Sequence, residues 1–321
     1  MIRRTACLIA HGLDPYRNQA LEKQLMDTLP EETAILYLWQ NRHTILIGRG
    51  QDPREVCAET FGGKVARRLS GGGAVYQDTG CVNFSFILPK HAFDIPLQMR
   101  IAGMAAAACG ARLEPAARGE LAINGRTCCV NDFFKDKSAA CHHGVFFIQS
   151  DETARARSLL HTQSRATQNL ADLIPSLTAE GLQQSLYWAF CRAYGMEAAM
   201  LDERMMDQRA IEESALQFAD RQWIWPPVDA YNISVQESFP WGSVTVHIRE
   251  DHGVIRAAKL YTDAMEAAFF DLIEQALTGS PFLVSSISAR ISQRLSQLRD
   301  PRLIQLAGDV SNLICRHIRR R

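Results

Sequence analysis

The sequence predicts an α+β protein: a mixed β-sheet flanked by helices, followed by a small C-terminal α+β accessory domain. Three observations predict this class. Strand-like segments lie on either side of a glycine-rich stretch at residues 67–80. Stripes of apolar residues with helical spacing occur between such segments. Two consecutive prolines, Pro226 and Pro227, separate a longer first part from a shorter second part, because they fit neither a helix nor a central strand.

In the first part, the segments are bounded by residues that typically start, turn or end an element. Asp14-Pro15 is typical of a helix start. Asn124-Gly125 is typical of a hairpin turn between two short strands. Gly110 and Gly195 are expected just beyond the ends of two helices. The predicted segments are strands over residues 34–39, 44–47, 65–66 and 82–88, and helices over residues 21–29, 101–109 and 182–190.

The second part predicts a hairpin and two helices. Valine and isoleucine alternate with polar residues over 244–249, Asp251-His252-Gly253 turns the chain, and residues 254–261 return as the partner strand. Apolar stripes over 269–277 and 303–314 predict the helices. The predicted domains are therefore residues 1–227 and 235–321.

Size, charge and cysteine usage exclude several classes of protein. The 321 residues, 47% hydrophobic and 22% charged, suit one large globular domain and a smaller one. Lys and Arg together number 35, as do Asp and Glu, so no charge excess favours nucleic acid or a membrane surface as partner. No apolar run approaches about 18 residues and no signal-peptide core opens the chain, so a cytoplasmic location is expected. The nine cysteines lack CxxC spacing, which suits free thiols in a reducing compartment.

The glycine-rich stretch is the most informative part of the sequence for function. Gly71, Gly72 and Gly73 let the backbone come within hydrogen-bonding reach of a ligand, because no Cβ blocks the approach. Their consecutive N–H groups can form an anion-binding concavity. Arg67 and Arg68 lie just before them, and an arginine fork suits a carboxylate or a phosphate. The alternative, on turn chemistry alone, is a hairpin with solvated arginines.

This stretch resembles the signature of the lipoate–protein ligase A family, within the wider biotin/lipoyl protein ligase-like fold. The family pattern is close to R-R-x-S-G-G-G-A-V-(Y/F)-H-D-x-G-N-x-N-F-S-F. The chain departs from it at Gln77, where the family usually has His, and at Cys81, where it has Asn. The resemblance extends over nearly the whole chain, including the accessory domain. Further segments that resemble family motifs are residues 47–53, 117–130, 141–145 and 164–170.

The resemblance implies a two-step reaction. Lipoate attacks the α-phosphate of ATP to give lipoyl-AMP, and a lysine of an acceptor protein then takes the lipoyl group. ATP, Mg²⁺ and lipoate are the implied ligands, and the implied partners are lipoyl domains of 2-oxoacid dehydrogenases or the glycine-cleavage carrier protein. Glu120 is the implied candidate for Mg²⁺, and His143 is expected near the floor of the lipoyl pocket. The residues implied to bind substrate or nucleotide are Arg68, Ser70, Gly71, Gly72, Gly73, Tyr76, Asp78, Cys81, Asn83, Glu120 and His143.

The lysine of the family motif G-R-K, which supplies a cation at the carboxylate and phosphate, is replaced here by Thr127. A threonine hydroxyl donates a hydrogen bond but carries no charge, and loss of a preorganised charge costs on the order of 10²-fold or more in rate. Nearby, Gly119-Glu120 replaces Asn-Asp and Cys129-Val130 replaces Ser-Gly. The chain is either a working ligase, with Lys135 or Lys137 reaching in, or a paralogue that has lost adenylation. Such a paralogue would bind lipoate or lipoyl-AMP as a carrier, sensor or partner subunit.

Cysteine chemistry is a third possibility. Cys128 and Cys129 lie close to the expected reaction centre, and Cys141 falls one residue from the cysteine that lipoyl-fold octanoyltransferases use. A thiol there could carry an acyl group if its pKa were lowered. Those enzymes resemble the ligases in having the lysine, so Thr127 counts against this possibility, and small buried side chains are the alternative. A zinc site at Cys141 and the two following histidines is not expected, since no fourth ligand has suitable spacing.

Overall fold

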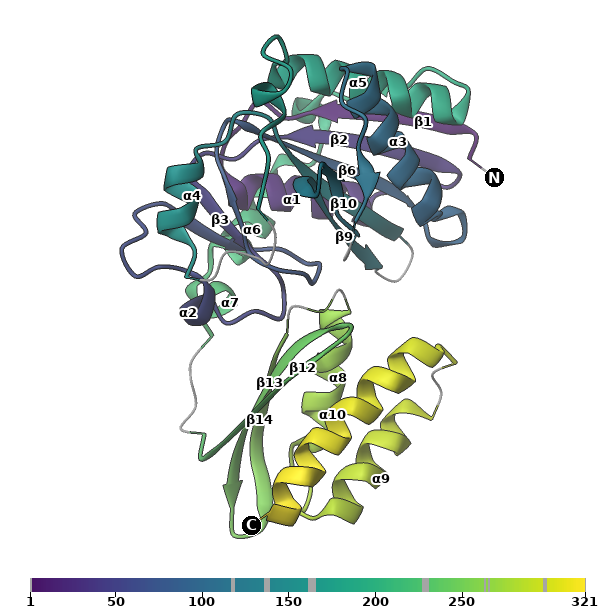
Figure 1. The fold of residues 1–321 in the computed structure, drawn as a ribbon. Helices are drawn as coiled ribbons and strands as arrows, with labels where there is room; N and C mark the ends of the chain where they lie inside the picture. The colour runs from purple at the N-terminus through teal and green to yellow at the C-terminus, as the bar shows by residue number, and fades with distance from the viewer. Residues whose placement is uncertain are drawn as a thin grey trace. The chain divides into compact units, whose positions relative to one another are not determined.

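The computed structural model describes residues 2–116, 119–135, 139–160, 166–226, 231–262, 264, 266–296 and 299–320. It contains two compact units. The first comprises residues 1–47, 54–68 and 74–224, and the second comprises residues 48–53, 69–73 and 225–321. Each unit combines a sheet with helices, so the predicted α+β class is confirmed (Figure 1).

The first unit is built on a mixed eight-stranded sheet with the strand order β11-β1-β2-β6-β10-β9-β8-β7. β1 pairs in parallel with β2 and with β11, and the other neighbours pair antiparallel. The strands are β1 Arg4–Ile9, β2 Thr33–Trp39, β6 Cys81–Pro89, β7 Glu114–Pro115, β8 Leu121–Ile123, β9 Arg126–Lys135, β10 Ala139–Phe147 and β11 Ala199–Met200.

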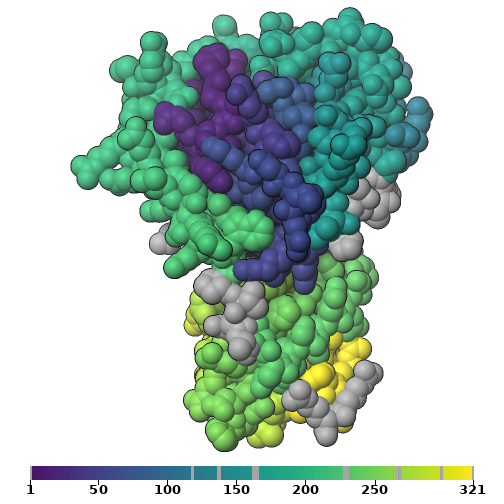
Figure 2. Space-filling view, turned by 90° about the vertical axis from the view of Figure 1, so that its left-hand side faces the viewer, coloured from purple at the N-terminus to yellow at the C-terminus, as the bar shows by residue number. Residues whose placement is uncertain are grey.

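Helices cover both faces of this sheet (Figure 1). On one face, α3 (Ile95–Ala108) and α5 (Ala179–Tyr194) pack against the apolar side chains of β6, such as Phe84, in the main core. On the other face, α1 (Pro15–Asp27) contacts β6 and β10. α6 (Gln208–Ala219) lies along α1, seen in Figure 2 as green atoms beside purple ones. Because both faces are covered, β6 is buried along its whole length, polar residues included.

A second, three-stranded sheet of the first unit has the order β4-β3-β5. β3 pairs in parallel with β4 and antiparallel with β5. Its strands are β3 Thr44–Ile47, β4 Lys64–Arg67 and β5 Val75–Gln77. The remaining helical segments are α2 Pro53–Val56, α4 Glu152–Ser158 and α7 Arg221–Ile224, with 3-10 turns η1 Lys90–Ala92, η3 Leu170–Asp172 and η4 Glu203–Met205.

The second unit packs three helices on an antiparallel sheet, β12-β13-β14. Its core combines the inward residues of the strands with apolar stripes of the helices. None of the helices that the model describes, in either unit, is long and apolar enough to cross a membrane. The elements are β12 Ile233–Phe239, β13 Gly242–Asp251, β14 Val254–Thr262, α8 Ala267–Leu277, α9 Val284–Leu295 and α10 Pro301–Arg320.

The predicted segments all form the expected kind of element, with differences in length and place. Gly195 caps α5 in the left-handed conformation, at φ +67°. α3 begins at Ile95, earlier than predicted, because the Asp94 side chain accepts a hydrogen bond from the first turn. β9 is ten residues long rather than short. Residues 142–144, the H-H-G motif within the segment 141–145 that resembles a family motif, lie inside β10. The predicted domain boundary at residue 227 falls outside the described residues.

Candidate functional site

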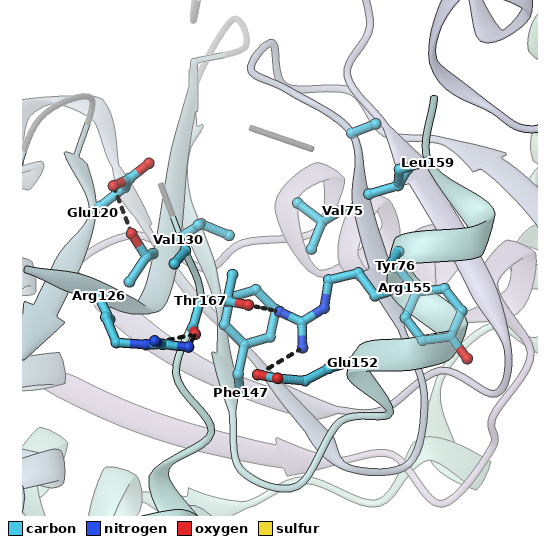
Figure 3. A pocket seen from close by; sticks show the side chains of 14 residues that line it. Val75, Tyr76, Glu120, Arg126, Val130, Phe147, Glu152, Arg155, Leu159 and Thr167 are labelled. Atoms are coloured by element: carbon cyan, nitrogen blue, oxygen red, sulfur yellow. Dashed lines mark hydrogen bonds and ion pairs between the residues drawn. The ribbon is translucent and has the colours of Figure 1, made fainter. Parts of the chain in front are cut away.

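A cavity of about 560 Å³ lies in the first unit, where β5, the β8–β9 hairpin, the end of β10 and α4 meet (Figure 3). Part of its wall is apolar and part carries charge of both signs. The lining residues are Ala74, Val75, Tyr76, Glu120, Arg126, Thr127, Val130, Phe147, Glu152, Arg155, Ala156, Leu159, Ala166 and Thr167. Of the residues predicted to bind substrate or nucleotide, Tyr76 and Glu120 line this cavity, and so does the lysine position, Thr127.

Thr127 is buried, and its hydroxyl is already engaged. Its Oγ1 donates a hydrogen bond to the carboxylate of Glu120 at 2.8 Å. Its backbone N–H donates to the Ala166 carbonyl at 3.0 Å, and its own carbonyl accepts from the N–H of Gln168 at 2.8 Å. Neighbouring backbone thus holds the threonine on both sides. The position offers the cavity a neutral hydroxyl next to a carboxylate.

The lysines considered as substitutes lie elsewhere or outside the described residues. Lys135 is exposed at the end of β9, with its ammonium 5.5 Å from the centre of the Phe93 ring, and it does not line the cavity. Lys137 lies outside the described residues.

The neighbouring departures from the family pattern fit the backbone without strain. Gly119 has φ +76°, a conformation that asparagine, the family residue, also tolerates. Val130 lies in extended strand β9, paired with Val145 of β10, so the backbone freedom of glycine is not needed there. The Val130 side chain packs beside Val75 and forms part of the cavity wall. Valine here adds apolar surface to the cavity, in place of the open space that glycine would leave.

Arg68 has a partner that the sequence did not suggest. The side chain is 1% exposed, its Nη2 lies 2.7 Å from Oδ2 of Asp132, and its Nη1 donates to the Leu46 carbonyl at 3.0 Å. Burial raises the pKa of Asp132 even though the arginine charge acts in the opposite direction. Arg67 donates to the carbonyls of Trp223 and Ile224 at 2.8 and 2.7 Å. Neither arginine is a solvated surface charge.

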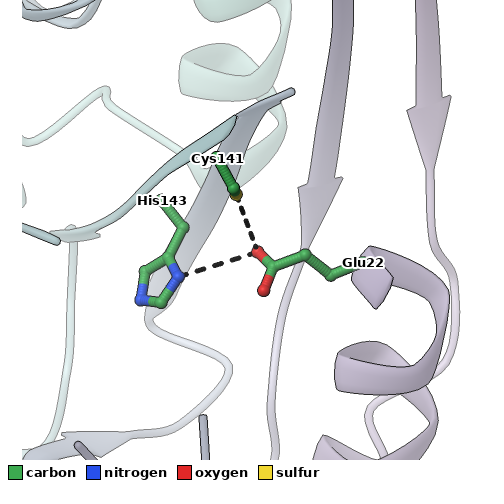
Figure 4. A group of neighbouring side chains, drawn as sticks. All are labelled: Glu22, Cys141 and His143. Atoms are coloured by element: carbon green, nitrogen blue, oxygen red, sulfur yellow. Dashed lines mark hydrogen bonds and ion pairs between the residues drawn. The ribbon is translucent and has the colours of Figure 1, made fainter. Parts of the chain in front are cut away.

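His143 belongs to a buried cluster with Glu22 of α1 and Cys141 of β10 (Figure 4). Oε1 of Glu22 accepts hydrogen bonds from the Ser85 hydroxyl at 2.5 Å and the Cys141 thiol at 3.6 Å, and lies 3.7 Å from Nδ1 of His143. Burial raises the pKa of Glu22 to about 6 and lowers the pKa of His143 well below its usual range. His142 points to the opposite face of the strand, against Phe84 and Phe86. In this cluster Ser85 and Cys141 are hydrogen-bonded to Glu22, and His143 lies beside the same carboxylate. The two histidines face opposite sides of the sheet and do not form a joint site.

Asn83 and Asp78, two further predicted binding residues, are held by hydrogen bonds of their side chains. Gln77 accepts from Nδ2 of Asn41 at 2.8 Å and donates to Oδ1 of Asn83 at 2.9 Å, which makes a chain of buried amides. Asp78 accepts from the N–H groups of Gly80 and Asp151 at 2.9 and 2.8 Å, and so ties the β5–β6 turn to the start of α4. These side chains have structural partners in addition to any ligand.

The glycine triplet and Ser70 belong to the second unit. Gly72 has φ +83°, and its N–H donates to the Ala264 carbonyl at 3.2 Å. The Ser70 carbonyl accepts from the N–H of Arg49 at 2.8 Å. Ala74, the residue after the triplet, lines the cavity of the first unit.

The cysteines considered for catalysis are small buried side chains rather than activated thiols. All nine cysteines are described, and all are free. Cys128, Cys129 and Cys141 are each no more than 2% exposed. Burial raises the pKa of Cys128 to about 11 and the pKa values of Cys129 and Cys141 well above their usual range. Cys81 is also fully buried, and burial raises its pKa to about 12. A raised pKa is the reverse of what an acyl-carrying thiol needs.

Sequence reasoning missed three charged residues: Glu22, Asp132 and Arg155. Glu22 lies on the buried face of an amphipathic helix, where a charged residue gives no pattern of its own. Asp132 and its neighbour Asn131 lie between apolar residues in the middle of β9, and this polar pair was the available signal. Arg155 is one of two arginines in α4, and only the fold distinguishes it from Arg157, which is exposed.

Comparisons with known proteins agree with one another. Residues 14–190 match the model of the lipoyl protein ligase A/B catalytic domain, and residues 229–298 match that of the bacterial lipoate protein ligase C-terminus. Among solved structures, LipL1 of P. falciparum in complex with lipoate is similar over 97% of this chain and 99% of its own, with a TM-score of 0.86 and 19% identity.

Two further structures resemble part of the chain. One is a lipoate-protein ligase A bound with ATP, at 18% identity and TM-score 0.59, covering 71% of this chain and 100% of its own. The other is the archaeal bipartite lipoate protein ligase of Thermoplasma acidophilum, studied with its E2 lipoyl domain. It has 16% identity and TM-score 0.60, and covers 72% of this chain and 99% of its own.

Proposed function

This chain belongs to the family of the lipoyl protein ligase A/B catalytic domain, and on that premise we propose that it is a lipoate–protein ligase with unequal half-reactions. It passes lipoyl from lipoyl-AMP to a lysine of a lipoyl domain, and it adenylates lipoate slowly. The observation that carries this proposal is Thr127, a neutral side chain at the cavity position where the family has lysine.

The two half-reactions need charge to different degrees. In the first, a carboxylate oxygen bonds to the α-phosphorus of ATP and pyrophosphate leaves, so negative charge gathers at phosphorus and needs cations. In the second, the amine of a lysine attacks an acyl carbon that is already activated, and AMP leaves. Replacement of the family lysine by Thr127 therefore slows the first step more than the second.

The ligands follow from the relatives. LipL1 binds lipoate and a ligase A binds ATP, and the cavity offers an apolar wall and charged groups that suit an acyl-adenylate. The carboxylate of Glu120 and the hydroxyl of Thr127 are the oxygen ligands that Mg²⁺ prefers, and Mg²⁺ there would offset phosphate charge. Lipoyl domains of 2-oxoacid dehydrogenases or the glycine-cleavage carrier protein are the proposed acceptors, since the archaeal relative was studied with an E2 lipoyl domain. Free cysteines suit a cytoplasmic location.

A binding protein without catalysis is the second candidate. It is favoured by the hydrogen bond between Thr127 and Glu120, because a threonine held in this way adds no charge to the cavity. Such a paralogue would hold lipoate or lipoyl-AMP as a carrier, sensor or partner subunit. The cysteine-dependent acyltransferase has no comparable support, since burial raises the pKa values of all three candidate thiols.

The test is transfer from supplied lipoyl-AMP to a purified lipoyl domain, followed as the mass added to the acceptor lysine. A ligase of this kind lipoylates the domain faster than lipoyl-AMP alone does. A binding protein does not accelerate transfer, although lipoyl-AMP raises its melting temperature. Acceleration with the melting shift supports the ligase, a shift without acceleration supports the binding protein, and the absence of both contradicts the proposal.

A further inference from the structure

Arg155 of α4 is a buried arginine with unused hydrogen-bonding capacity. The residue is 7% exposed and lines the cavity (Figure 3). Its Nη1 donates to the hydroxyl of Thr167, but Nε and Nη2 are buried without a hydrogen-bond partner among the described residues. The carboxylate of Glu152 lies 4.0 Å from Nη2, beyond hydrogen-bonding range, and its side chain is 51% exposed.

The surroundings hold the guanidinium in one orientation. Its central carbon lies 4.7 Å from the centre of the Phe147 ring, a cation–π contact. The bond to Thr167 fixes one end of the fork. Burial of a charged group without its hydrogen bonds is unfavourable, and native proteins rarely leave such groups unpaired. An arginine fixed in this way, beside a cavity, indicates that a ligand supplies the missing acceptors.

Arg155 and the lysine position are linked through one residue. Thr167, which accepts the hydrogen bond from Arg155, forms a parallel bridge with Thr127. Both Thr127 and Arg155 line the cavity. Arg126 also lines it, but this arginine is exposed and directs Nε and Nη2 to the Thr167 carbonyl at 3.2 and 3.0 Å. Of these two arginines, Arg155 is the buried one, and its Nε and Nη2 have no hydrogen-bond partner among the described residues.

We propose that Arg155 binds an anionic oxygen of the bound adenylate or its precursors, and so supplies charge that Thr127 does not. The inference rests on the proposed function and names a further residue of its binding site. A guanidinium suits such an oxygen because it stays protonated and can donate through two nitrogens at once. The oxygen belongs to a phosphate or to the lipoate carboxylate, and the ligands of the test separate the two sources.

The experiment measures binding by calorimetry for the full chain and three variants. Arg155→Gln removes the charge, Arg155→Lys keeps it, and Arg157→Gln is the matched control, since Arg157 is exposed in the same helix and does not line the cavity. The ligands are MgATP, lipoate, adenosine and a non-hydrolysable lipoyl-AMP analogue. Loss of a charged hydrogen bond predicts at least about tenfold weaker binding of the analogue to Arg155→Gln. Binding of adenosine is unchanged, Arg155→Lys binds with intermediate affinity, and Arg157→Gln binds like wild type.

MgATP and lipoate identify the source of the oxygen. If MgATP alone binds more weakly to Arg155→Gln, the oxygen is a phosphate oxygen, and if lipoate alone does, it is a carboxylate oxygen. Equal affinity of wild type and Arg155→Gln for both ligands and for the analogue overturns the role of Arg155 and leaves the proposed function standing. Failure of wild type to bind any of the three overturns both.

Thermal unfolding separates a binding role from a structural one. A guanidinium kept for a ligand adds little stability without it, so unliganded Arg155→Gln melts within about 2 °C of wild type or higher, and the rise that the analogue produces shrinks. If Arg155→Gln melts much lower but keeps the full rise with the analogue, Arg155 has a structural role and the proposal is wrong.

Discussion

Two buried arginines of the first unit differ in how their charge is held. Arg68 lies against Asp132 and a backbone carbonyl, whereas Nε and Nη2 of Arg155 have no hydrogen-bond partner among the described residues. Removal of one member of a buried ion pair leaves the other charge uncompensated, which is strongly destabilising. The two arginines should therefore respond in opposite ways to substitution.

The first residue-scale prediction concerns Arg68→Ala. The variant removes the charge that pairs with the buried carboxylate of Asp132, and Nε2 of His143, 3.8 Å from that carboxylate, does not replace it because the pKa of His143 is lowered by burial. Unfolding in urea should therefore show a loss of about 3–5 kcal/mol. The place of Arg68 just before the glycines predicts a larger effect on binding of an acyl-AMP analogue than on stability, whereas the pairing with Asp132 predicts the reverse order. Arg157→Gln, in an exposed position, is the control. A loss below about 1 kcal/mol would mean that the pair contributes little.

The second residue-scale prediction concerns pH. The pKa of Glu22 is about 6 in the folded protein and ordinarily 4.5, because burial disfavours its charged form. The stability that protonated Glu22 contributes is complete below pH 4.5 and is lost as pH rises through about 6, a change of about 2 kcal/mol. Glu22→Gln cannot titrate, so the stability of the variant relative to wild type should rise by about that amount between pH 4 and 7.5.

Urea unfolding at several pH values checks this dependence on Glu22. Glu59→Gln, which changes an exposed carboxylate in the same unit, is the matched control. If the unfolding free energies of wild type and Glu22→Gln differ by a constant amount between pH 4 and 7.5, the burial of Glu22 does not control its ionisation.

At the scale of elements, β10 shows why the H-H-G motif needs its glycine. A Cβ on Gly144 would lie 2.4 Å from Cζ of Phe84 and 2.5 Å from Oδ1 of Asn131. The side chains of Phe84 and Asn131, from the two neighbouring strands, thus occupy the space that a Cβ would need. The motif serves packing within the sheet as well as the placement of His143.

Gly144→Ala should therefore destabilise the first unit by about 1–3 kcal/mol through overpacking. Gly103→Ala is the matched control, because Gly103 lies within α3 and a Cβ there would meet nothing within 4 Å. Alanine favours a helix over glycine, so the control should gain about 0.5–1 kcal/mol. The denaturant midpoints of the two variants should move in opposite directions, and a neutral Gly144→Ala would show that the Phe84 and Asn131 side chains can move aside.

The elements that the sequence did not predict have weak local signals. β12 alternates, but its outward residues are charged or polar, and it lies at the edge of its sheet, paired with β13. α9 contains four serines, which favour helices weakly, and its apolar stripe is short. The predicted segments, by contrast, combine a clear period with a turn or cap residue, such as Gly195 after α5. A helix or strand was thus predictable where the hydrophobic period and a turn or cap residue at its end agreed.

At the scale of the whole molecule, the sequence predicted more of the fold than of the site. Motif order was enough to predict an α+β protein with an accessory unit. The candidate residues come from distant segments. Arg155 donates a hydrogen bond to Thr167, which bridges to Thr127, and Glu22 of α1 accepts a hydrogen bond from Cys141 of β10. No local pattern gives such pairs. Thr127 could be identified as the lysine position because the motif around it matches the family pattern without gaps.

Thr127→Lys tests whether the missing lysine charge slows adenylation. A lysine at this position would lie beside Glu120, and the ammonium would restore a cation to the cavity. Rescue of adenylation should be partial, because Gly119, Cys129 and Val130 remain different from the family and effects of contacting residues are rarely additive. Thr127→Ser, which keeps the hydroxyl and adds no charge, is the matched control. If Thr127→Lys adenylates lipoate no faster than Thr127→Ser, the missing lysine does not explain slow adenylation.

The most direct measurement is pyrophosphate release by wild-type protein with ATP and Mg²⁺, with and without lipoate, beside lipoyl transfer from supplied lipoyl-AMP under the same conditions. The account predicts lipoate-dependent pyrophosphate release well below about 1 s⁻¹, together with transfer that is at least about tenfold faster than release. Pyrophosphate release at about 1 s⁻¹ or faster would contradict it, because the threonine would then be no handicap to adenylation.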